Sequence, residues 1–151
     1  MSKKHKEQIL ELLRTGDESN IELALVMEES LGNALDDVWS DLAEIYQYIY
    51  TNRGTRKDWV QLLSKKRIDL QGARIQKIPK GFKYLKSLKI LDLASNRIAK
   101  IPRELTVLKN LEALYLTNNQ IAELPIFINK LRGLNCLSLS NNPLAAIDIE
   151  L

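Results

Sequence analysis

The chain has 151 residues, a hydrophobic content of 45% and a formal net charge of +3, which fit a folded protein of one or two domains. No apolar run approaches the length of a membrane-spanning helix, and no hydrophobic signal segment follows the charged N-terminus. One cysteine excludes an internal disulfide. We therefore expect a cytoplasmic protein without a membrane span.

Residues 1–64 carry helical spacing and no long repeat. A first helix is expected to end at Thr15-Gly16-Asp17, and Ser19 or Asn20 to cap a second. Asn33, followed by Asp36, predicts the cap of a third helix, and Thr55 that of a short fourth. The apolar surface of the second helix is assigned to Ile21, Leu23, Ala24, Leu25 and Met27.

A segment of 23 residues recurs along the rest of the chain, as copies at 65–87, 88–110, 111–133 and 134–151. Each copy places apolar residues at the same positions, as in the column formed by Ile68, Leu91, Leu114 and Leu137. Such a period predicts a solenoid, because one unit cannot bury its own apolar face and neighbouring units must stack. The alternation in L-x-L further predicts a short strand in each copy.

The pattern L-x-x-L-x-L-x-x-N-x-I-x-x-I-P-x-x-L-x-x-L resembles the leucine-rich-repeat family. Its length and its Ile/Leu-Pro step are most similar to the class found in Ras-associated scaffolds and in bacterial cytoplasmic repeat proteins. The resemblance implies an α/β fold, namely a short right-handed β-α horseshoe of about four coils with a parallel concave sheet. Residues 1–64 would form an α-helical N-terminal cap on residues 65–151; an independent four-helix domain is the alternative.

Asparagine follows the expected strand in three copies, at Asn96, Asn119 and Asn142. An amide can satisfy both donors and acceptors of the turn backbone, so we interpret this column as structural. In the family, such asparagines form a ladder between coils. The first copy has Ala73 at this position and should lack the ladder bond, as an atypical terminal coil would.

The outward side of the expected sheet is the first candidate site. Parallel strands lie about 4.8 Å apart, so Asp69 and Asp92 should lie side by side, with Tyr115 continuing their row. The predicted partner-binding residues are Arg67, Asp69, Arg74, Asp92, Arg97, Tyr115 and Ser138. A polar row with one aromatic anchor suits a protein or peptide partner, whereas a merely solvated sheet face is the alternative.

A basic ridge is the second candidate, with lysines at every third residue: Lys77, Lys80, Lys83, Lys86 and Lys89. It could bind anions or nucleic acid, but a solvated helical return is favoured, and no interleaved aromatic residues support base stacking. The charge is unevenly divided, since residues 1–60 carry a net −5 and residues 61–151 a net +8. This asymmetry could steer a partner or help the two parts dock.

Two further features concern apolar surface. Ile126 and Phe127 occupy positions that are charged in the previous copy, which indicates either a contact patch or local packing. The last copy ends at Leu151 without a covering helix. Either Asp148-Ile149-Glu150 protects this edge, or two chains pair through it as a homodimer.

Catalytic patterns are absent from the sequence. His5 is the only histidine and lies far from Cys136, and there is no phosphate-binding glycine loop and no cluster of metal ligands. We expect no enzyme activity, no cofactor and no metal. The predicted function is a protein-interaction adaptor that uses the concave sheet, with a small GTPase pathway as one partner class that the resemblance implies.

Overall fold

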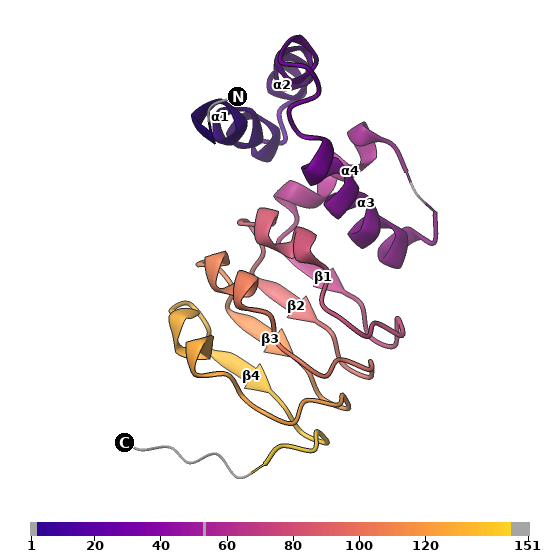
Figure 1. Ribbon diagram of the computed structural model, residues 1–151, viewed down its shortest axis with the longest axis vertical. Coiled ribbons are helices and arrows are strands. Elements are labelled where there is room, and N and C mark those ends of the chain that lie inside the picture. Colours follow the sequence, from indigo (N-terminus) through magenta and orange to yellow (C-terminus); the bar gives the residue numbers. More distant parts are fainter. Residues whose placement is uncertain (1–2, 53, 146–151) are drawn as a thin grey trace. The chain divides into compact units, whose positions relative to one another are not determined.

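The computed structural model describes residues 3–52 and 54–145 and divides into two compact units, residues 1–65 and residues 66–151. The first unit contains the helices and the second contains the strands (Figure 1). The expected fold is confirmed: a parallel four-stranded repeat sheet is preceded by a helical region. The role of the helical unit as a cap stays a prediction.

The helical unit contains α1 (Lys3–Arg14), α2 (Glu18–Ser30), α3 (Asp36–Tyr50) and α4 (Arg56–Ser64). The apolar residues of α3 recur at spacings of three and four, so they share one side of the helix and are buried together. The fully buried side chains of the unit include Ile9, Leu13, Ala24, Leu35, Val38, Leu42, Ile45, Leu62 and Leu63.

Two of the predicted helix caps are wrong. Asp17 caps α2, because its carboxylate accepts a hydrogen bond from the Asn20 amide at 3.0 Å, so the helix begins before Ser19. Asn33 lies in the turn after α2, where its φ of 56° places it in the left-handed region and its amide donates to the Glu28 carbonyl. Leu35 holds the N-cap position of α3. The Thr55 prediction is confirmed, since Asp58 closes a capping box with it.

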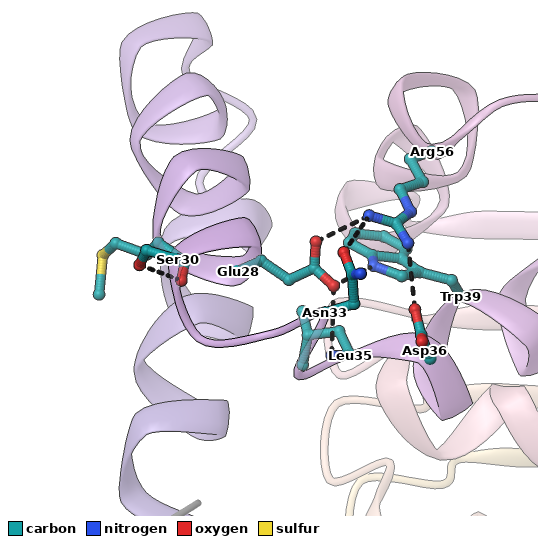
Figure 2. A network of polar contacts seen from close by, with 8 residues as sticks. Glu28, Ser30, Asn33, Leu35, Asp36, Trp39 and Arg56 are labelled. Carbon is teal, nitrogen blue, oxygen red and sulfur yellow. Dashed lines mark hydrogen bonds and ion pairs between the residues drawn. The ribbon is translucent and has the colours of Figure 1, made fainter.

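Glu28 is the centre of a polar network that joins three helices (Figure 2). Its side chain is 1% exposed, and its carboxylate receives the Arg56 guanidinium at 2.8 Å, the Trp39 indole N–H at 3.2 Å and the Leu35 amide at 3.4 Å. Arg56 also binds Asp36 at 3.0 Å and lies over the Trp39 ring. A buried carboxylate is tolerated here because a cation and two N–H donors compensate for its lost hydration.

Lys6 on α1 donates to both carboxylate oxygens of Asp37 on α3 at 2.6 Å. This hydrogen bond is the main reason that the pKa of Asp37 is lowered, and burial opposes it. A lowered folded-state pKa adds stability above the unfolded pKa, and that stability is lost as pH falls through the folded pKa.

We therefore expect Lys6→Ala to raise the pKa of Asp37, as measured by an NMR titration of its carboxyl carbon. Lys57→Ala, an exposed control on α4, should leave that pKa unchanged. Asp37 is largely exposed, so the accompanying loss of stability near neutral pH should stay below about 1 kcal/mol. An unchanged Asp37 pKa in Lys6→Ala would contradict the assignment of the pair.

The repeat unit contains strands β1 (Arg67–Asp69), β2 (Ile90–Asp92), β3 (Ala113–Tyr115) and β4 (Cys136–Ser138). They form one parallel sheet in the order β1-β2-β3-β4, which follows the sequence (Figure 1). Short 3₁₀ helices return the chain between strands: η1 (Lys80–Tyr84), η2 (Arg103–Val107) and η3 (Ile126–Lys130). Each begins directly after the proline of its repeat, which fixes φ at the entry to the return.

The apolar columns face inward and form the core of the repeat unit. Leu91, Leu93 and Leu114 have no exposed surface, and Phe82, Leu85 and Leu108 seal the side of the 3₁₀ returns. Leu137 and Leu139 at β4 are only half-buried. The core is therefore formed between stacked coils, since one coil cannot bury its own apolar face.

The asparagine column is a ladder, and each rung reaches back to the preceding coil. Asn119 donates to the carbonyls of Leu93 and Leu116, and its Oδ1 accepts the Ile98 amide at 2.9 Å. Asn96 and Asn142 repeat this arrangement one coil earlier and one coil later. Ala73 stands at this position in the first coil, and in the part of the chain that the structure describes β1 is the first strand of the sheet.

Candidate functional site

The strand register aligns the outward polar residues in one row. Asp69 lies opposite Asp92, Asp92 opposite Tyr115, and Tyr115 opposite Ser138. We call Asp69, Asp92, Tyr115 and Ser138 the sheet row. A second outward row, Arg67, Ile90, Ala113 and Cys136, runs beside it. Sequence periodicity therefore predicted the neighbours correctly, and all four residues of the sheet row retain exposed surface.

The two carboxylates are held by their own strand ends. Asp69 Oδ1 accepts the Gln71 amide at 3.1 Å, and Asp92 Oδ1 accepts the Ala94 amide at 3.0 Å. Each hydrogen bond fixes one carboxylate oxygen relative to the backbone two residues later. Arg67 approaches Asp69 only to 4.0 Å, and both side chains are more than half exposed. The row therefore presents two oriented acceptors to solvent.

Ser138 and Thr117 share a hydrogen bond of 2.6 Å between their hydroxyl oxygens, at the end of the row beyond Tyr115. Arg74 and Arg97 are exposed on the turns that follow β1 and β2, and Arg74 has a φ of 60°. Both arginines therefore lie in the turns beyond the carboxyl ends of β1 and β2. Their role in binding remains a prediction.

Lys89 and Glu112 form an ion pair that sequence reasoning missed. Lys89 directly precedes β2, Glu112 directly precedes β3, and their charged atoms are 2.7 Å apart. The signal was available, because the two residues are 23 positions apart and so share a repeat column. Lys89 therefore lies at the amino ends of the strands and does not continue the basic ridge along the return.

The remaining lysines of the ridge follow the first coil's return. Lys77 and Lys80 are exposed before and in η1, and Lys86 is exposed just after it. Lys83 is half-buried, and its ammonium lies 4.7 Å from the centre of the Tyr84 ring. The structure thus brings four of the five predicted lysines to one return, with one of them held against an aromatic ring.

The two apolar candidates, Ile126 and Phe127, differ in how much of each side chain is exposed. Ile126 at the start of η3 is 87% exposed, whereas Phe127 is half-buried. Position 126 aligns with Lys80 and Arg103 of earlier coils, which explains its outward direction. The predicted protection or pairing at Asp148-Ile149-Glu150 lies outside the described residues.

Among residues 3–52 and 54–145, no group of three or more His, Cys, Asp or Glu side chains could hold a metal ion. Cys136 is an exposed free cysteine on β4. None of the helices that the structure describes is both long and apolar enough to cross a membrane.

Family comparisons agree with the geometry of this repeat sheet. A leucine-rich-repeat model matches residues 66–121, and a second model, of two leucine-rich-repeat copies, matches residues 109–150. The chain is a leucine-rich-repeat protein. Leucine-rich repeats generally mediate protein–protein interactions and are typically non-catalytic modules, which supports the coarse functional prediction. No curated protein matched the chain.

Solved structures give the same fold. A leucine-rich-repeat protein from Leptospira interrogans is 38% identical over 60% of this chain and 23% of its own, with a TM-score of 0.56. An internalin from Listeria monocytogenes is 26% identical over 74% of this chain and 32% of its own, with a TM-score of 0.53. The leucine-rich-repeat ectodomain of an Arabidopsis thaliana membrane receptor kinase, in complex with Casparian strip integrity factor 2, is also similar. It is 30% identical over 56% of this chain and 11% of its own (TM-score 0.50).

The chain therefore spans less than a third of the length of each of these structures. Their partners and activities are properties of those proteins.

Proposed function

We propose that this protein is a non-catalytic adaptor that binds a protein or peptide through the sheet row. The observation that carries the proposal is the alignment of two fixed carboxylates, one tyrosine and one serine across four adjacent strands. An aromatic ring beside oriented acceptors offers both apolar contact area and polar specificity. The family's general use in protein interaction supports the same conclusion.

The chemistry of the row indicates what the partner presents. Paired strands lie about 4.8 Å apart, so one lysine or arginine of the partner would reach both Asp69 and Asp92. An apolar group next to it would cover the Tyr115 ring. We propose a cytoplasmic partner, and the Ras-associated class that the repeat resembles makes a small GTPase or its effector the first protein to test.

The basic ridge is the competing site, with an anion or nucleic acid as its ligand. Its lysines are less uniform than the sequence indicated, because Lys89 is paired with Glu112 and Lys83 lies against Tyr84. The sheet row is instead built from neighbours in strict register. This difference favours the sheet row.

The test is affinity capture from an extract of the source cells at near-physiological salt, followed by mass spectrometry and titration of the purified partner. The Asp69→Lys/Asp92→Lys/Tyr115→Ala variant is expected to weaken binding by at least about a hundredfold, because it reverses two contacts and removes the aromatic anchor. All three side chains reach the surface, so the fold should persist.

The matched control is Glu104→Lys/Glu123→Lys, which changes the net charge equally at exposed positions away from the strands. This control variant should bind the captured partner as tightly as the wild type does. Equal binding by all three proteins would place the site elsewhere. Retention of one nucleic acid by all three, lost in Lys77→Glu/Lys80→Glu, would assign function to the basic ridge and overturn the proposal.

A further inference from the structure

Helix α2 and its C-cap residue Leu31 expose large apolar side chains. Ala24 is fully buried, whereas Leu23 is 51% exposed, Val26 63% and Leu31 39%. Leu23 is one of the residues that the sequence pattern assigns to the apolar surface of the second helix. Residues three and four apart are neighbours on a helix, so Leu23, Val26 and Met27 form one continuous strip. Leu31, the C-cap residue of α2, lies four residues after Met27 and continues the strip. We call Leu23, Val26, Met27 and Leu31 the α2 strip.

A hollow adjoins this strip. It has a volume of about 420 Å³ and is lined by Gln8, Glu11, Leu12 and Thr15 on or just after α1, and by Met27 on α2. Met27 thus belongs to both the strip and the hollow, and Leu12 adds apolar surface from the neighbouring helix. An exposed strip that continues into a hollow between two helices is suited to receive apolar side chains from a partner.

The charges beside the strip are acidic. Glu22 and Glu29 are helical neighbours of Val26 and are exposed, and Glu18 lies one turn before Glu22 on the same side. Glu11 lies across the strip, at the hollow. The nearby cations Lys6 and Arg14 are engaged in ion pairs with Asp37 and Glu7. Carboxylates therefore flank the apolar strip on both sides.

We infer that the α2 strip and its hollow dock a basic amphipathic helix of a partner protein. Anchors at helical spacing suit a helix that places its own apolar stripe in a groove, with lysines and arginines facing the flanking carboxylates. A second copy of this surface would oppose acid to acid, and anionic lipid headgroups would be repelled in the same way. This site is independent of the sheet row.

The probe is a synthetic amphipathic helix of about 18 residues, with one leucine stripe flanked by lysines and arginines. Calorimetric titration with the full chain should detect binding that Leu23→Ser/Val26→Ser weakens about tenfold or more, because two apolar contacts are lost. The matched control, Val107→Ser/Ile126→Ser, removes similarly exposed apolar groups from the repeats and should bind as the wild type does.

Charge is tested separately. Glu22→Lys/Glu29→Lys should also weaken binding about tenfold, whereas Glu104→Lys/Glu123→Lys on the repeat unit should not. The sheet-row variant should keep full affinity for the peptide, so failure here and failure of the proposed function can be told apart. Binding that is absent from the wild type, or unchanged in Leu23→Ser/Val26→Ser, overturns the inference. A wild-type dimer in sedimentation that becomes monomeric in Leu23→Ser/Val26→Ser would also overturn it, by assigning the strip to a second copy.

Discussion

Arg56→Ala is expected to lower the free energy of unfolding of the helical unit by about 2–3 kcal/mol. The substitution leaves the Glu28 carboxylate buried at 1% exposure without its cation, while the Trp39 indole N–H and the Leu35 amide still donate to it. The expected cost lies below the about 3–5 kcal/mol of a fully buried pair, because Arg56 itself is 39% exposed and water can replace part of its interaction with Glu28.

Urea unfolding followed by tryptophan fluorescence measures this effect, since both tryptophans of the chain, Trp39 and Trp59, lie in the helical unit. Asp36→Ala is the matched control, because it removes the other carboxylate that binds Arg56 but leaves no buried charge behind. Its cost should stay below about 1 kcal/mol, as for an exposed ion pair. Equal costs for the two variants would show that Glu28 does not depend on Arg56.

Asn119→Ala should destabilise the repeat unit by about 3–4 kcal/mol, because one truncation leaves several buried backbone groups without partners. The Ile98 amide loses its acceptor, and the carbonyls of Leu93 and Leu116 lose a donor. Far-UV circular dichroism in urea would measure the loss of stability. Hydrogen exchange should show that the Ile98 amide loses protection.

Asn110→Ala is the control for the ladder, because the same substitution there removes an exposed hydrogen bond to the Lys86 carbonyl. It should cost less than about 1 kcal/mol. Asn142→Ala should fall between the two, since Asn142 makes equivalent bonds but is only half-buried. If Asn119→Ala proved as mild as Asn110→Ala, the ladder would contribute little to stability.

The repeat sheet could be predicted because its information is local and periodic. A column of residues 23 positions apart fixes which strands are neighbours, so the opposition of Asp69 to Asp92 followed from counting. Lys89 shows the limit of that approach, since spacing by threes grouped it with Lys77 and Lys80 although the repeat column paired it with Glu112. Whether the sheet row binds a partner is a question of chemistry that periodicity does not answer.

The helical unit was harder to predict, because its details depend on contacts distant in sequence. The buried Glu28 carboxylate is paired with Arg56, 28 residues later in the sequence. Asn33 is a residue type that favours helix N-caps, yet here it takes a left-handed conformation in the turn between α2 and α3, and Leu35 holds the N-cap position of α3. Leu23 is apolar by type, and the packing of α1 against α2 decides which of the apolar residues of α2 are buried.

The backward direction of every asparagine rung has a consequence for how such a chain can change length. If a segment of 23 residues were duplicated within 88–133, its asparagine would bind the backbone carbonyl and amide of the preceding coil. Its own backbone would offer the same groups to the asparagine of the following coil. Each junction would then repeat the asparagine contacts that already join neighbouring coils. Recombination could therefore lengthen or shorten the binding surface by whole coils, without redesigning any contact, and so alter the size of partner that the protein accommodates.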